Sequence, residues 1–510
     1  MNYVNALDNE FNYKLTENGG LAHKSTCDAL YDMFALGGAY RTRSDEDCVF
    51  LFMKAFEENP TYAMKCLFYL RDILQGQGER RFFRVCIKWA ADNHPLEMER
   101  NLKHIPEFGR WDDLYAFVGT KLEASMWAFM YEQFRLDMTS KTPSLLGKWL
   151  KSENTSSAES RALGAKTRKA FHMPPAAYRK SLSSLRKRIN VLERLMSAGK
   201  WEEIEFDKIP SKAGLIYKNA FARHDVERMK AKVEVQFYAD FAKDKNAKVN
   251  TKALYPYEVV EKAIKVIYDY SYWSWVPKNV PLDDTNRLMV NKYWDNLAEY
   301  MSKLDMNALC VVDTSGSMHG TPINIAISLG MIAADKARGP VHGRYISFSS
   351  RPQLIKVEGV DFVDKVRRIY ETNLCENTNL EATFDMLLNV AQKNHMKQKD
   401  LPKSIIVISD MEIDCAYGSY GWGSDHSVAR AKNRTMMENM RRKWKRAGYD
   451  LPSMVYWNVN ARHDTFLDDG PDVTYVSGAS AILFEQVARG VTAQDLMFDK
   501  LDSERYACIK

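Results

Sequence analysis

The sequence predicts two units of different fold class. An α-helical repeat solenoid or ring is expected over residues 1–300, and a doubly wound parallel sheet over residues 301–510. Between Phe11 and Glu299, apolar residues recur at three- and four-residue steps, which is typical of helices. After Asp305, apolar runs alternate with helical patterns, which is typical of a parallel sheet covered on both faces. The length of 510 residues also favours more than one domain.

The helical half is predicted to consist of short helices in series. Glycine, proline and polar clusters separate them, an organisation typical of stacked helical pairs. Neither a strand and hairpin signal nor a repeat of fixed period is evident in this half, and the Ser- and Ala-rich residues 152–165 indicate an exposed loop. The expected helices are Ala29–Ala35, Cys48–Phe56, Ala63–Leu74, Phe82–Ala91, Ser125–Phe134, Pro175–Met196 and Val259–Tyr268.

In the second half, strands and helices are predicted to alternate. After the last helix, an apolar stripe formed by Leu496, Phe498 and Leu501 is expected to pack back against the solenoid. The expected strands are Ala308–Val312, Tyr345–Phe348, Ser404–Ser409, Ser453–Val459 and Val473–Val476. The expected helices are Ile323–Ala337, Val363–Tyr370, Glu381–Gln392, Ser427–Ala447 and Ala479–Arg489.

Composition excludes several classes of protein. No apolar run approaches the ~20 residues that a membrane helix needs. Residues 1–10 are polar and of mixed charge, unlike a secretory signal. The 8 cysteines are scattered without a CxxC motif or a Cys/His cluster, so neither a zinc site nor a disulfide framework is expected. We therefore expect an intracellular, cytoplasmic protein that does not contact a membrane.

Positive charge is concentrated in one segment. Residues 141–200 contain 14 Lys or Arg against 3 Glu and no Asp, whereas the whole chain has a net charge of only +6. Such a segment is the usual footprint of a polyanion, although a solvated helix face has the same composition. On the expected helix, Arg179 and Arg186 are seven residues apart, as are Lys180 and Lys187, so each pair shares a face. The candidate phosphate-binding residues are Lys166, Arg168, Lys169, Arg179, Lys180, Arg186, Lys187 and Arg188.

Oxygen-bearing side chains follow two of the predicted strands. Asp313, Ser315 and Ser317 form a D-x-S-x-S loop directly after the first strand, with Gly316 expected to permit the turn. Asp410 ends a second strand, and Thr378 lies in a loop between the two. Ligands of open α/β sheets bind beyond the carboxyl ends of strands, and oxygen-only ligands suit Mg²⁺ or another hard divalent cation. The alternative is a turn that only caps the next helix. Glu412 and Asp414 are alternative extra ligands, but capping or solvated roles are expected for both.

The set Asp313, Ser315, Ser317, Thr378 and Asp410 resembles the metal-ion-dependent adhesion site (MIDAS) of von Willebrand factor A domains, which have a Rossmann-like fold. The resemblance implies that the serines and Thr378 ligate directly or through water, with the aspartates in or behind the first coordination shell. It also implies a bound Mg²⁺ that leaves one position open for an acidic residue of a protein partner.

The order of the two units resembles the Ro autoantigen family, in which a TROVE ring of HEAT-like helical repeats precedes a von Willebrand A domain. Further stretches resemble an uncharacterised sister family of the same architecture more closely. They are residues 76–81 (GQGERR), 105–114 (IPEFGRWDDL), 178–186 (YRKSLSSLR), 201–211 and 220–224 (AFARH). The resemblance implies a ribonucleoprotein scaffold that binds small structured RNA or single-stranded RNA ends.

Two functions therefore remain open: a Ro-like RNA-binding scaffold with a metal-binding domain, and a protein-interaction module that binds no RNA. The basic segment favours the first and the metal residues favour the second. A metal-dependent nuclease or phosphatase is disfavoured because little is present to hold a second metal. No G-x-S-x-G or HExxH motif occurs, so we do not expect an enzyme. Phe171, Tyr178 and Trp201 are the nearest aromatic residues that could stack on unpaired bases.

Overall fold

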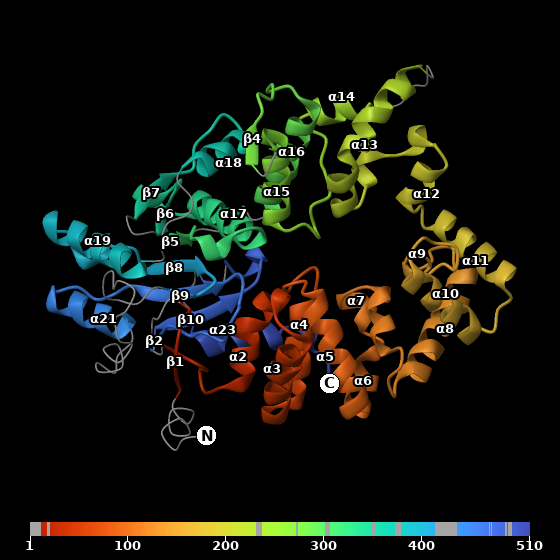
Figure 1. Cartoon of the computed structure of the whole chain (residues 1–510), viewed down its shortest axis with the longest axis horizontal. Helices are drawn as coiled ribbons and strands as arrows, with labels where there is room; N and C mark the ends of the chain where they lie inside the picture. The colour runs from red at the N-terminus through yellow and green to blue at the C-terminus, as the bar shows by residue number, and fades with distance from the viewer. Residues whose placement is uncertain are drawn as a thin grey trace.

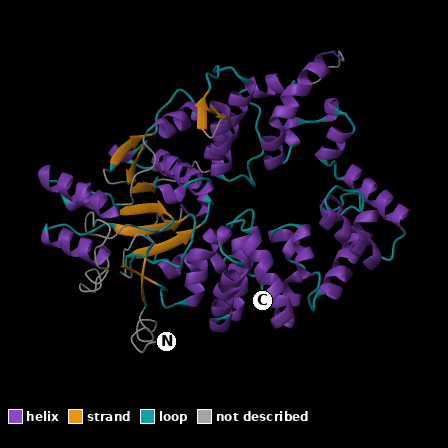
Figure 2. Ribbon diagram, viewed as in Figure 1, coloured by secondary structure: helices purple, strands orange, loops and turns teal. Residues whose placement is uncertain are grey.

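In a computed structural model of the chain, the strands gather at one side and helices form most of the remainder (Figure 2). The structure describes residues 12–17, 21–230, 237–271, 274–300, 306–348, 352–372, 379–413, 436–468, 470, 472–484, 487 and 492–510. Within these ranges, no helix is both long enough and apolar enough to cross a bilayer.

The second half of the chain contains a mixed six-stranded sheet in the order β10-β9-β8-β5-β6-β7. All neighbouring strands are parallel except β6 and β7, which are antiparallel. The prediction of an entirely parallel sheet was wrong at this edge: β7 is four residues long and buries only Ile355, so it carries almost no apolar signal. The strands are β5 (Ala308–Asp313), β6 (Arg344–Phe348), β7 (Gln353–Lys356), β8 (Ser404–Ser409), β9 (Ser453–Asn458) and β10 (Val473–Ser477).

Helices cover this sheet as the alternating pattern predicts. α17 packs against β5, β6 and β8, and α19 packs against β6 and α21. The first part of the expected helix Ser427–Ala447 and residues 485, 486, 488 and 489 of the expected helix Ala479–Arg489 lie outside the described residues; the described part of the latter contains the 3-10 helix η8 (Ala481–Leu483). The described helices are α17 (Thr321–Lys336), α18 (Phe362–Glu371), α19 (Leu380–Lys393), α21 (Met436–Arg446) and α23 (Ala493–Leu501).

The first half forms a series of short helices that curves away from the sheet and returns to it (Figure 1). The series begins with α2, which packs against β10, and ends with α15 and α16, of which α15 packs against α17 and α18. Its α-helices are α2 (Ala29–Leu36), α3 (Asp45–Glu58), α4 (Pro60–Arg71), α5 (Arg80–Asn93), α6 (Pro95–Leu102), α7 (Ile105–Phe108), α8 (Glu123–Thr139), α9 (Leu146–Trp149), α10 (Ala158–Ala170), α11 (Pro175–Arg188), α12 (Leu192–Ser197), α13 (Ser211–Lys230), α14 (Tyr238–Lys243), α15 (Pro256–Ile267) and α16 (Thr285–Tyr300). The 3-10 helices η1 (Gly37–Thr42), η2 (Trp111–Phe117), η3 (Trp201–Glu203) and η4 (Phe206–Lys208) connect them.

Three local expectations in this half were wrong. Two hairpins are present, β1 (Tyr13–Leu15) with β2 (Leu21–His23) and β3 (Tyr268–Ser271) with β4 (Ser274–Pro277); their strands are too short for a periodic signal. The expected loop over 152–165 contains the start of α10, which Ser157 caps by accepting a hydrogen bond from the Ser160 N–H at 3.2 Å. The single basic helix is divided into α11 and α12 at Asn190, whose φ of 49° is left-handed.

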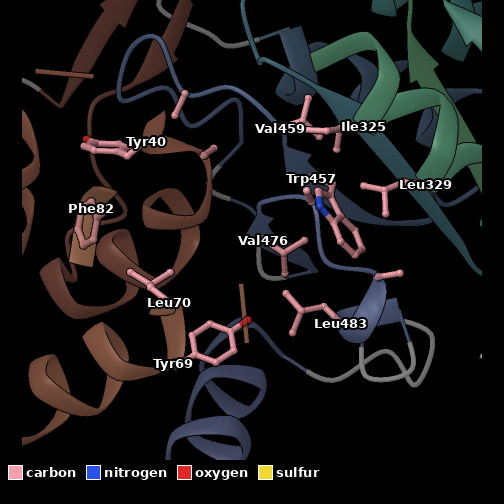
Figure 3. Close-up of a cluster of buried hydrophobic side chains, with 14 of the residues drawn as sticks. Tyr40, Tyr69, Leu70, Phe82, Ile325, Leu329, Trp457, Val459, Val476 and Leu483 are labelled. Carbon is pink, nitrogen blue, oxygen red and sulfur yellow. The ribbon is translucent and has the colours of Figure 1, made fainter. Parts of the chain in front are cut away.

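The two units share one hydrophobic core. Figure 3 shows Tyr40, Leu70 and Phe82 of the helical series facing Trp457 and Val476 of the sheet. The backbones also approach closely, because the Gly38 N–H donates to the Ser477 hydroxyl at 3.0 Å. A Cβ at Gly38 would lie 3.0 Å from the Ser477 backbone, so only glycine fits this contact without displacement. The helical series is therefore anchored rigidly to the sheet at its first helices.

The C-terminal tail packs against the helical series, as its apolar stripe predicts. α23 contacts α2 and α4, and the 3-10 helix η9 (Glu504–Tyr506) also contacts α4. Leu496 and Leu501 are fully buried, whereas Phe498 is 38% exposed and stacks edge-on against Tyr62. The last residues of the chain thus cover helices from its beginning.

Candidate metal centre and basic surface

The candidate metal residues meet where two neighbouring strands end. β5 and β8 are parallel, with Val312 opposite Ile408, so their carboxyl ends lie side by side. Asp313 ends β5, and Ser409 and Asp410 follow at the end of β8. Hydrophobic strands buried along their whole length thereby hold two carboxylates at one edge of the sheet.

Hydrogen bonds fix the Asp313 carboxylate. Its Oδ1 accepts from the Ser315 N–H at 2.9 Å, and its Oδ2 accepts from the Ser409 hydroxyl at 2.6 Å. The hydroxyl oxygens of Ser315 and Ser317 are 3.0 Å apart, so three of the predicted residues form one cluster. Sequence reasoning missed Ser409, although its place directly before Asp410 put it at the same strand end.

The D-x-S-x-S loop does not cap the following helix. α17 begins at Thr321 after Gly320, and no side chain accepts a hydrogen bond at its cap. The turn does not require glycine at position 316, because its φ is not positive and a Cβ there would meet no atom within 4 Å; the left-handed φ of 89° belongs to Gly320, directly before α17. The hydroxyls of Ser315 and Ser317 are therefore not engaged in capping α17.

Asp410 is fully buried and incompletely satisfied. Its Oδ1 accepts from the Glu412 N–H at 3.3 Å, but its Oδ2 has no hydrogen-bond partner among the described residues. The nearest cation is the Arg462 guanidinium, whose Nη2 lies 3.3 Å from Oδ2 without the alignment of a hydrogen bond. A buried carboxylate oxygen without a donor is costly, and a bound cation would remove that cost.

Both carboxylates have perturbed acidities. Burial, and to a smaller extent the neighbouring Asp410 carboxylate, raise the pKa of Asp313 to about 7. Burial also raises the pKa of Asp410, against the opposing effects of the Ser317 hydroxyl and of Arg462. Two buried carboxylates that disfavour each other's ionisation are the electrostatic setting that a divalent cation stabilises.

The residues present fit a hard cation. Two carboxylates and two hydroxyls supply only oxygen ligands, as Mg²⁺ prefers. Across the described ranges, no group of three or more His, Cys, Asp or Glu side chains could hold a metal, so a site here depends on the hydroxyls. Thr378 lies outside the described residues; its neighbour Asn379 caps α19 by accepting from the Ala382 N–H at 2.9 Å.

The expectation for Glu412 was wrong, whereas Asp414 lies outside the described residues. Glu412 is fully buried and neither caps a helix nor faces solvent. Its carboxylate accepts hydrogen bonds from the Glu17 N–H at 2.8 Å and the Thr465 hydroxyl at 3.2 Å. It therefore joins the N-terminal hairpin to the edge of the sheet.

Three of the predicted phosphate-binding arginines have structural partners instead. Arg186 donates to the Gly147 and Leu150 carbonyls and to the Ser152 hydroxyl at 2.8–3.1 Å. Arg188 donates to the carbonyls of Asp137 and Met138, at the end of α8. Arg168 pairs with Glu153 at 2.8 Å. These guanidiniums hold helix ends and loops together. The expectation that Arg179 and Arg186 share one exposed face for phosphate binding was therefore wrong.

The remaining five predicted cations are exposed. They lie on α10 and α11, and none forms an ion pair with a carboxylate in the described part of the chain, although the Lys166 charge helps to lower the pKa of the Glu123 carboxyl group. Lys180 and Lys187 are seven residues apart and share a face of α11. The five are Lys166, Lys169, Arg179, Lys180 and Lys187. We call them the basic surface.

The aromatic residues near the basic surface are not free to stack on bases. Phe171 and Tyr178 are buried, and the Tyr178 hydroxyl donates to the Lys151 carbonyl at 2.8 Å. Trp201 stacks on His224, with ring centroids 3.8 Å apart and an interplanar angle of 14°. The expectation of base stacking by Phe171 and Tyr178 was therefore wrong, because both rings belong to the helical core.

Two family models match the chain. One model, described as a domain of unknown function (DUF2828), matches residues 16–145 and 144–305, which is more than half of the protein. The chain belongs to the DUF2828 family. A second model, also described as a domain of unknown function (DUF7788), matches residues 307–497 of this DUF2828 protein.

Relatives of this DUF2828 protein include a viral protein. Uncharacterized protein L728 of Acanthamoeba polyphaga mimivirus is 27% identical over 517 residues, covering 93% of the present chain and 84% of the viral protein. Among solved structures, the Ro (RSR) protein of Deinococcus radiodurans matches with 14% identity and a TM-score of 0.41 over 91% of this chain and 100% of that one. A similarity of this size indicates neither shared contacts nor a shared function.

Proposed function

We propose that the protein is a Ro-like RNA-binding scaffold that binds RNA through the basic surface and whose sheet unit holds a divalent cation. The observation that carries the first part is the set of five exposed cations on α10 and α11, none of which forms an ion pair with a carboxylate among the described residues. Unpaired cations on neighbouring helices attract phosphates because their binding releases counterions. The curved helical series, which a Ro-like architecture also requires, supports this proposal (Figure 1).

Phosphate contacts supply affinity rather than sequence preference, because they do not read bases. The burial of Phe171 and Tyr178 leaves few rings for stacking near the basic surface. The expected ligand is therefore an RNA recognised by its backbone and shape. Its affinity should fall steeply as the salt concentration rises.

A mobility-shift titration with a structured and a single-stranded RNA, at two salt concentrations, tests this proposal. The variant is Lys180→Glu with Lys187→Glu, which reverses two exposed cations on one face of α11. The matched control is Lys393→Glu with Lys399→Glu, which makes the same change in net charge on exposed residues of the sheet unit. We expect the first pair to weaken binding at least tenfold and the control to have little effect. Equal affinities for both variants would contradict the proposal.

For the sheet unit, we propose that Asp313, Ser315, Ser317 and Asp410 hold Mg²⁺ or a similar hard cation, with Thr378 as a further ligand. The supporting observation is the buried Asp410 Oδ2, which has no hydrogen-bond donor among the residues that the structure describes. The cation would supply positive charge to two buried carboxylates and an electrophilic position for an anionic group. Residues 1–300 and 301–510 would then be separate units in function, one for RNA and one for the cation.

The same centre favours a second candidate function, a protein-interaction module. A hard cation held by two carboxylates and hydroxyls can accept one further carboxylate, supplied by an acidic residue of a partner. Partner capture that is lost on chelation of divalent cations, without RNA binding at any salt concentration, would favour this alternative over the RNA scaffold.

A further inference from the structure

The loop after β9 brings a guanidinium to the candidate metal centre. Arg462 lies between two carboxylates: its Nη2 is 2.6 Å from Glu17 Oε2 and 3.3 Å from Asp410 Oδ2. Asp410 is fully buried, whereas the side chains of Arg462 and Glu17 are 31% and 39% exposed. One cation thus connects the buried centre to a surface carboxylate from the N-terminal hairpin.

We infer that Arg462 is an internal counter-cation of the metal centre, which neutralises Asp410 when no metal is bound and must leave Asp410 when a divalent cation binds there. The inference rests on the metal centre proposed above. Its physical basis is that a guanidinium and a divalent cation repel each other at one carboxylate, so the two compete for Asp410. Glu17, which already pairs with Arg462, then remains as its carboxylate partner.

The loop that carries Arg462 is firmly held, so only its side chain needs to move. The Arg462 carbonyl accepts from Arg43 Nη1 at 2.8 Å, and the Ala461 N–H donates to the Ala39 carbonyl at 3.1 Å. The guanidinium is incompletely satisfied: its Nη2 pairs with Glu17, but its buried Nε has no hydrogen-bond partner among the described residues. A well-placed backbone with an under-satisfied head group suits exchange between two carboxylates.

Glu17 is positioned independently of Arg462. Its N–H donates to Glu412 Oε2 at 2.8 Å, and the preceding Thr16 hydroxyl donates to the Ile413 carbonyl at 2.7 Å. These bonds attach the N-terminal hairpin beside the end of β8, two and three residues after Asp410. Glu17 already pairs with Arg462 through Oε2, while its Oε1 lies 3.7 Å from His463 Nδ1, so it can retain the guanidinium after it leaves Asp410.

The inference predicts effects of opposite sign for two neighbouring charges. Arg462→Gln removes the competing cation, so the full-length protein should bind Mg²⁺ about tenfold more tightly. Glu17→Gln removes the alternative partner, so Arg462 stays on Asp410 and Mg²⁺ binding should weaken several-fold. In the Arg462→Gln background, Glu17→Gln should have no effect. A purely long-range contribution of the Glu17 charge would persist in both backgrounds.

Isothermal titration calorimetry measures the Mg²⁺ affinity of the wild type, the two single variants and the double variant. Asp313→Asn is the site control, and Arg462→Lys is a variant that retains the charge. Arg462→Lys should stay near wild-type affinity, and melting curves check that each variant folds. If Asp313→Asn abolishes binding while Arg462→Gln leaves the affinity unchanged or lowers it, the inference is wrong and the metal centre stands. If neither the wild type nor any variant binds Mg²⁺, both the inference and the proposed centre are wrong.

Discussion

Arg505 and Asp72, which are 433 residues apart in sequence, form a bidentate ion pair. Arg505 Nε and Nη2 donate to the two Asp72 oxygens at 2.6 and 3.0 Å, and the Tyr506 hydroxyl donates to Oδ2 at 3.1 Å. Asp72 is fully buried at the end of α4. The pair therefore attaches the C-terminal tail to α4.

Arg505→Ala should lower the free energy of unfolding by about 3 kcal/mol, because it leaves the Asp72 carboxylate buried without its cation. Lys65→Ala is the control. It removes another ion pair between the tail and α4, but the Asp502 partner of Lys65 is 49% exposed, so a loss of under about 1 kcal/mol is expected. Urea unfolding of both variants measures the difference. Equal losses of unfolding free energy in the two variants would contradict a larger contribution of the buried Arg505–Asp72 pair.

Ser409→Ala should weaken Mg²⁺ binding about 10–100-fold, because outer hydrogen bonds orient the groups that hold a metal. The Ser409 hydroxyl donates to Asp313 Oδ2 at 2.6 Å, and without it the carboxylate keeps only the hydrogen bond from the Ser315 N–H to Oδ1. Ser404→Ala, at the opposite end of the same strand, is the matched control. Calorimetric titration with Mg²⁺ should separate the two variants, and an unchanged affinity in Ser409→Ala would exclude an orienting role.

Arg186→Gln should destabilise the helical series rather than act on RNA directly. Its guanidinium makes three hydrogen bonds to Gly147, Leu150 and Ser152, so a loss of roughly 2–3 kcal/mol is expected. Lys187→Gln, on the next residue, removes an exposed cation and should change stability by less than about 0.5 kcal/mol. Thermal and urea unfolding would measure both, and a larger loss for Lys187→Gln would reverse this assignment.

Stability should depend on pH through Lys218, which is buried on α13. Burial lowers the pKa of its ammonium group to about 8, from about 10.5 in an exposed lysine. The unfolded chain therefore binds more protons than the folded chain between those values, so stability from this group rises as pH increases from about 8 to about 10.5. Lys218→Met should flatten this rise by roughly 1–3 kcal/mol. Unfolding midpoints at pH 7.5 and 10.5 test it, and identical differences between wild type and variant at both pH values would contradict it.

The helices, the strand–helix alternation and the D-x-S-x-S loop could be predicted because each depends on local spacing. The partners of Asp410 could not, because Arg462 belongs to a loop 52 residues later that only the β8–β9 pairing brings near. Spacing placed Arg179 and Arg186 on one face of α11, but it could not show that α9 packs against α11 and engages the Arg186 guanidinium. Whether an arginine faces solvent or bonds to a neighbouring helix depends on the reach of its side chain as well as on its position along its own helix.

The most direct test of the RNA-scaffold proposal is photocrosslinking of the full-length protein to a bound structured RNA, followed by mass spectrometry of the crosslinked peptides. The account predicts that crosslinks concentrate in residues 158–188, which contain α10 and α11, and that they decrease in the Lys180→Glu, Lys187→Glu variant. Crosslinks confined to the sheet unit, or none above the level of a protein that does not bind RNA, would contradict it.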